Sequence, residues 1–161
     1  MPVFDSYLMV DWSAANTPKR GADSIWLGLT ARRRNGYVLS VLENPSTRAA
    51  ATERIIQLAS NALNRGQRML IGFDFPFGFP AGTAQRLGYR GLAWRNLWQT
   101  LEDEISDHDD NRNNRFDVAE SLNVRLTDEA FPFWGLPREE TRSHLLRRGR
   151  RPHGSTDLPA R

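Results

Sequence analysis

The chain lacks cysteine altogether, and histidine is scarce. Among its 161 residues there is no cysteine, and there are three histidines, none at the spacing of a metal-ligand pair. Without thiols the chain has no disulfide scaffold, no thiolate zinc site and no cysteine nucleophile. Carboxylates are therefore the expected ligands of any bound metal.

Long apolar runs are also missing, and the charge imbalance is small. No signal peptide is recognisable, and no stretch approaches the roughly 20 apolar residues of a membrane span, so we expect a soluble, cytoplasmic protein without a membrane partner. The net charge is +3. Seven arginines and three acids fall in residues 138–161, which leaves the rest of the chain close to neutral. The pI of 9.9 therefore does not by itself indicate nucleic-acid binding.

The first 80 residues alternate short apolar segments with turns. Strands are expected at residues 7–12, 24–31, 37–42 and 69–73, and a helix at residues 46–64 with Ser46 as its N-cap. Asn35-Gly36 favours a hairpin between the second and third strands. The helix acts as a crossover, so the fourth strand should run parallel to the first. This predicts an α/β fold with a mixed sheet of three antiparallel strands and a parallel fourth.

Residues beyond 80 favour helices. Apolar positions three and four residues apart predict a helix at residues 94–105, a second is expected at 117–125 from its apolar positions, and residues 81–89 and 139–148 are further candidates. The acidic stretch 102–110 lacks the glycine and the spaced glutamate of an EF-hand and reads as a solvated helix end. We expect residues 1–80 to form the core, 81–148 a helical extension of the same domain, and 149–161 a disordered basic tail.

Two aspartates end two strands that should be parallel neighbours. Asp11 ends the first strand, and Asp74 directly follows the fourth. Ligands bind outside the carboxyl ends of strands in open α/β sheets. Two carboxylates meeting there would repel each other, and Mg²⁺ or Mn²⁺ would relieve that repulsion. Such an ion supports displacement at phosphorus by activating water and stabilising the leaving oxygen.

Two further groups could contact a nucleic-acid substrate. Ser13, Asn16 and Lys19 follow the first strand and could bind a phosphate, or could form a polar loop without that role. Phe75 and Phe77 lie in the sequence FPFGFP, which could stack a base or could plug the core.

Four segments of the chain resemble a known family in order. They are VDWSAANTPKRGADSIWLG, IGFDFPFGFP, DNRNNRFDVAESLN and PFWGLP, and the resemblance spans most of residues 7–137. They resemble a bacterial family of uncharacterised proteins with a predicted ribonuclease H-like nuclease fold. The resemblance implies that fold and puts Asp11 and Asp74 in its metal-binding positions. Family labels from molybdopterin or cobalamin biosynthesis have no support in these residues.

Ribonuclease H-like nucleases generally add a third or fourth acid, and Asp117 and Glu120 are the candidates here. No segment clearly supplies a fifth strand followed by the helix that often carries that acid. Either the 117–125 helix provides it, or the chain is the N-terminal part of a longer protein. We favour the second explanation, which leaves open whether the chain alone is active or is a truncated, inactive member.

The function predicted first is a metal-dependent phosphodiesterase or nuclease that holds Mg²⁺ or Mn²⁺ at Asp11 and Asp74 and acts on nucleic acid. One alternative is an ATP-dependent phosphotransferase of the related actin-like and sugar-kinase fold. The stretch Asp11-Trp12-Ser13-Ala14 lacks the glycine that lets backbone amides approach a phosphate. The second, duplicated domain of those proteins is not seen in this sequence either, so the phosphotransferase function ranks below the nuclease function. The third interpretation is a non-catalytic binding module.

Overall fold

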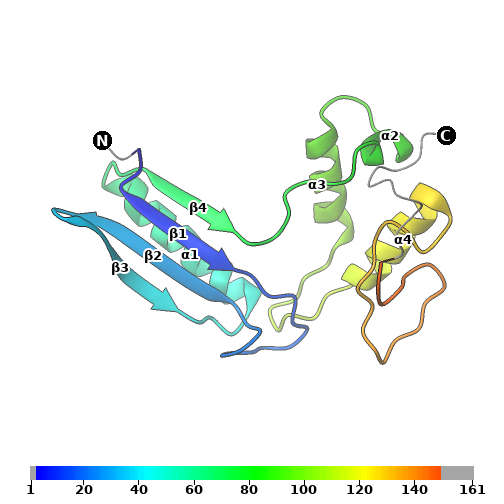
Figure 1. The fold of residues 1–161 in the computed structure, drawn as a ribbon, viewed down its shortest axis with the longest axis horizontal. Helices are drawn as coiled ribbons and strands as arrows, with labels where there is room; N and C mark the ends of the chain where they lie inside the picture. The colour runs from blue at the N-terminus through cyan, green and yellow to red at the C-terminus, as the bar shows by residue number, and fades with distance from the viewer. Residues whose placement is uncertain (1–2, 150–161) are drawn as a thin grey trace. The chain divides into compact units, whose positions relative to one another are not determined.

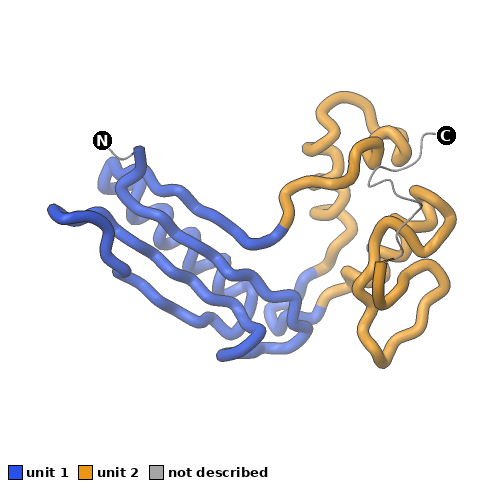
Figure 2. The backbone as a smooth tube through the Cα atoms, in the orientation of Figure 1, with its two compact units in different colours: residues 1–75, 107–112 blue, residues 76–106, 113–161 orange. Residues whose placement is uncertain are grey.

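The protein is described by a computed structural model that covers residues 3–149. It divides into two compact units (Figure 2). Unit 1 contains the chain up to Phe75 together with Asp107–Arg112, and unit 2 contains Pro76–Ser106 and the chain from Asn113 onward. Apart from Gly149, the basic tail expected at residues 149–161 lies outside the described residues.

Unit 1 is built on a four-stranded mixed sheet (Figure 1). Its strands are β1 (Ser6–Asp11), β2 (Trp26–Arg33), β3 (Gly36–Glu43) and β4 (Met69–Phe73), in the order β3-β2-β1-β4. β2 pairs antiparallel with both β1 and β3, and β4 pairs parallel with β1. Gly36 follows the predicted Asn35 turn and has a φ of +129°, which residues with a side chain rarely adopt. The α/β class and the mixed sheet predicted from the sequence are confirmed.

Helix α1 (Arg48–Asn64) covers one face of this sheet (Figure 1). It begins one residue later than expected from Ser46 as cap, because the hydroxyl oxygen of Thr47 accepts a hydrogen bond from the Ala50 amide at 3.2 Å. Alternate strand residues point toward the helix and pack with its apolar side. The buried core consists of Leu8, Val10, Ile25, Leu27, Leu29, Ala51 and Leu58.

The strand residues between these point to the other face of the sheet, and several of their side chains are exposed. Met9 and Leu70 are among them. Gly72 is the register partner of Met9, and a Cβ added to it would lie 2.9 Å from the terminal methyl of Met9. The Met9 side chain therefore occupies the space above Gly72. Asp11 lies two residues farther along β1 and shares this face.

Unit 2 is helical and contains α2 (Thr83–Arg86), α3 (Ala93–Glu104) and α4 (Arg115–Thr127). Its core is formed by three buried residues of α4, Val118, Leu122 and Leu126, with partly buried neighbours that include Leu101 and Phe133. The helices expected near 81–89, 94–105 and 117–125 are thus present, with shifted ends. Within residues 3–149, no helix combines the length and apolar character needed to cross a membrane.

The fourth helix expected at residues 139–148 is wrong, because this segment is irregular. Its backbone groups bond to other parts of unit 2. The amide of fully buried Asn123 donates to the carbonyls of Phe133 and His144, at 3.0 and 2.7 Å. The carbonyl of Leu146 accepts the Gly135 amide at 2.8 Å. These long-range bonds satisfy the backbone that a helix would have paired within itself.

Candidate functional site

Asp11 and Asp74 lie side by side at the carboxyl ends of β1 and β4. The parallel register pairs Met9 with Gly72 and Val10 with Phe73, so Asp11 and Asp74 form the next pair. The Asp74 amide continues the ladder by donating to the Val10 carbonyl at 3.2 Å. Both aspartates are exposed. The sheet therefore places two solvent-accessible carboxyl groups next to each other at one edge.

The two carboxyl groups interact with each other. Partial desolvation raises the pKa of Asp11 above its ordinary value of 3.8, and a hydrogen bond to Asp74 and repulsion from its charge raise it further. The two carboxyl groups therefore lie within interaction distance of each other. The repulsion between the two carboxyl groups makes this position attractive to a cation.

Asp74 is held in place by the start of the next loop. Its Oδ1 accepts the Trp12 amide at 2.8 Å. The Trp12 ring meets Phe73 and Phe75 edge to face, with centroids 6.0 and 6.4 Å apart. Phe75 therefore packs in an aromatic cluster beside the carboxylates. Phe77 belongs to unit 2 and is 59% exposed.

The loop that follows β1 carries the residues expected to contact a phosphate. The Ser13 hydroxyl donates to the Asp23 carbonyl at 3.1 Å and accepts the Ala15 amide at 3.2 Å, which closes the loop on itself. Lys19 pairs with Asp23 at 3.5 Å on the surface. Asn16 is exposed in the same loop. The Ser13 hydroxyl thus has a structural role, while Lys19 and Asn16 remain accessible.

Arg48, which the sequence reasoning missed, holds this loop against α1. Its buried guanidinium forms a two-pronged pair with Asp107, with both N–O distances 2.6 Å. Its remaining N–H groups donate to the carbonyls of Ser13, Ala15 and Asn111. All five donors of the guanidinium are therefore used. Arg48 joins the loop after β1 to the segment Asp107–Arg112.

Two asparagines complete this support. Buried Asn111 accepts the Arg48 amide at 2.8 Å and donates to the Thr17 carbonyl at 3.1 Å. Asn44 accepts the Gly21 amide at 2.7 Å and donates to the Ser24 hydroxyl at 2.8 Å. The loop is therefore fixed along most of its length by side chains remote in sequence. Arg48 and Asn111 are 63 residues apart, so no local sequence pattern could predict that they support this loop together.

The candidates for a third acid lie on α4 of unit 2 and have a different partner. Arg142 contacts Asp117 at 2.6 Å and Glu120 at 3.3 Å. The His144 amide donates to Glu120 at 3.0 Å, and this bond together with the Arg142 guanidinium lowers the pKa of Glu120. Both acids thus anchor the irregular segment of unit 2.

The donor set at Asp11 and Asp74 suits a hard divalent cation. Mg²⁺ is commonly held by one or two carboxylates and keeps several waters, and both aspartates are accessible to solvent. Among the described residues, no cluster of three or more acidic, histidine or cysteine side chains could hold a metal. The pair is thus a two-carboxylate site.

No protein-family model, curated protein or solved structure matches this chain. The site must therefore be judged on its own geometry.

Proposed function

We propose that the protein is a metal-dependent phosphodiesterase that acts on nucleic acid, with Asp11 and Asp74 as the ligands of Mg²⁺ or Mn²⁺. The observation that carries the proposal is the contact between two exposed carboxyl groups at the ends of parallel β1 and β4. The strand order β3-β2-β1-β4, with a helix between β3 and β4, supports a ribonuclease H-like assignment. The four sequence segments support membership of the predicted nuclease family.

The bound cation would supply activation of water and stabilisation of the charge that develops on the leaving oxygen. The chain's own residues would hold and orient the substrate. Lys19 offers an exposed positive charge on the loop after β1, which is suited to a phosphate next to the scissile one. The Trp12 amide fixes the orientation of Asp74, and Arg48 fixes the course of the loop.

A hydrolysis assay tests this proposal. The substrates are bis(4-nitrophenyl) phosphate and end-labelled single-stranded DNA and RNA, each with millimolar Mg²⁺, Mn²⁺ or EDTA. Because a catalytic metal contributes several kcal/mol to the transition state, Asp11→Asn and Asp74→Asn should each lower metal-dependent hydrolysis by about a hundredfold or more. Asparagine at position 74 can still accept the Trp12 amide, so the loop should stay in place.

The matched control is Asp109→Asn. Asp109 is an exposed acid of unit 1, so the substitution changes the charge equally without touching the pair. It should retain wild-type hydrolysis. Full activity in either Asp11→Asn or Asp74→Asn, or no hydrolysis of any substrate by the wild-type chain, would contradict the proposal.

A further inference from the structure

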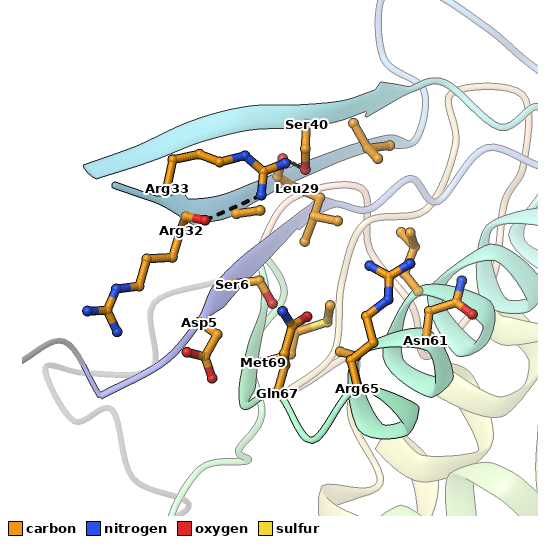
Figure 3. Close-up of a pocket in the computed structure, with 14 residues that line it drawn as sticks. Asp5, Ser6, Leu29, Arg32, Arg33, Ser40, Asn61, Arg65, Gln67 and Met69 are labelled. Carbon is orange, nitrogen blue, oxygen red and sulfur yellow. Dashed lines mark hydrogen bonds between the residues drawn. The ribbon is translucent and has the colours of Figure 1, made fainter. Parts of the chain in front are cut away.

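A cavity lies between the sheet and α1 at the end of unit 1 remote from the aspartate pair (Figure 3). Its volume is about 450 Å³, which falls in the range of small-molecule sites. Its floor includes three buried apolar residues of β2 and α1, Leu29, Leu58 and Ala62. The cavity therefore offers an apolar surface to an occupant rather than a purely polar cleft.

Ser6, the first residue of β1, lines the cavity and has an unpartnered hydroxyl. The residue is only 5% exposed. Among residues 3–149, its Oγ is the only buried side-chain polar atom without a hydrogen-bond partner. A buried hydroxyl without a partner is unfavourable, so native structures generally pair such groups. An occupant of the cavity that accepts a hydrogen bond would satisfy it.

Further donors surround the same space. Asn61 and Arg65 come from the end of α1, and Gln67 from the connection to β4, as Figure 3 shows. No ion pair or side-chain hydrogen bond involves Arg65 within the part of the chain that the structure describes. The one acid of the lining, Asp5, already accepts the Arg68 backbone amide at 2.9 Å. The rim is therefore rich in donors, and its three arginines, Arg32, Arg33 and Arg65, make it positively charged.

We propose that this cavity binds a small organic carboxylate with an apolar body. The apolar part would lie against Leu29, Leu58 and Ala62, and the carboxylate would accept from Ser6 and Arg65. A guanidinium–carboxylate contact is among the stronger polar interactions available to such a ligand. Since Ser6 and Asp11 stand five residues apart on β1, this site lies about 16 Å from the aspartate pair. It is distinct from the proposed phosphodiesterase site.

The test is a titration of the full chain with octanoate, followed by isothermal calorimetry and by amide chemical shifts. Saturable binding with shifts at Ser6 and Gln67 is expected. Acetate lacks the apolar body and octanol lacks the charge, so each should bind at least about tenfold more weakly. No shift at millimolar octanoate, or equal binding of acetate or octanol, would overturn the proposal.

Two variants locate the binding, and one controls for charge. Arg65→Gln should weaken octanoate binding by about tenfold, because it removes the charged partner. Arg68→Gln makes the same charge change three residues away and outside the lining, and should leave the affinity unchanged. Equal weakening by both would mean non-specific attraction and would refute the site. Ser6→Ala should also weaken binding while leaving the unliganded protein as stable as wild type or more so, since it removes an unpaired hydroxyl.

Discussion

Replacing Arg48 by methionine should destabilise unit 1 strongly. The substitution keeps an unbranched side chain but removes the pair with Asp107 and the bonds to three backbone carbonyls. The Arg48 side chain is 8% exposed, whereas that of Asp107 is 41% exposed. Breaking a buried pair costs about 3–5 kcal/mol, and Asp107 can regain water, so we expect a loss of about 3 kcal/mol.

Arg54→Met provides a matched comparison. Arg54 also makes a two-pronged pair, with Glu43, at 2.7 and 2.8 Å. Both side chains of this pair are about a third exposed, Arg54 at 32% and Glu43 at 37%. Exposed pairs contribute about 0–1 kcal/mol, so this variant should lose less than about 1 kcal/mol. Because both arginines make two-pronged pairs, the difference between the two variants tests how burial of the pair affects stability.

Native-state hydrogen exchange is the appropriate assay, because the chain has two compact units and one global transition would not report on unit 1 alone. Slow amides of β1 and β2 report the free energy of unfolding of unit 1. In Arg48→Met, amides of residues 13–17 should also exchange faster than in wild type. A loss below 1 kcal/mol in Arg48→Met, or an equal loss in Arg54→Met, would refute the reasoning.

Three further predictions concern single residues. Folding raises the pKa of Asp11 above its ordinary value of 3.8, so the free energy of unfolding should fall as the pH rises from 3.8 through the folded-state pKa. Asp11→Asn should remove this dependence in urea denaturation and, without metal, should leave the protein at pH 7 at least as stable as wild type, because it removes the repulsion from Asp74. A wild-type pH dependence in that variant would contradict this. Gly72→Ala should cost about 1 kcal/mol by the same assay, because the flexible end of Met9 must move; an unchanged stability would show that Met9 does not lie there. Asn123→Ala should lower the free energy of unfolding, measured by hydrogen exchange of α4, by about 3 kcal/mol, because it leaves the Phe133 amide and the carbonyls of Phe133 and His144 unpaired. A loss under 1 kcal/mol would argue against this structural role of Asn123.

Local patterns predicted most of unit 1. Short apolar segments bounded by turns predicted the strands, Asn35-Gly36 predicted the hairpin, and the crossover helix predicted the parallel pairing of β1 with β4. The adjacency of Asp11 and Asp74 followed from that pairing, because neighbouring parallel strands bring their carboxyl ends to one edge. Each of these predictions depended on a pattern of a few neighbouring residues or on the general rules for how strands and helices are connected.

Long-range contacts could not be predicted in the same way. No local pattern distinguishes Arg48 from the other arginines of the chain, because its partner Asp107 lies 59 residues away. We expected a helix at residues 139–148, yet Asn123 and Glu120 bind the backbone of His144 and hold this segment irregular. The unpaired hydroxyl of Ser6 is visible only when β1, α1 and the cavity between them are known.

The central claim is that Asp11 and Asp74 together hold a divalent cation, and calorimetric titration of the chain with Mn²⁺ and Mg²⁺ tests it most directly. We predict saturable binding of one ion by the wild type and by Asp109→Asn, and its loss in Asp11→Asn and in Asp74→Asn. No binding by the wild type at millimolar metal, or undiminished binding in either of the last two variants, would contradict the account.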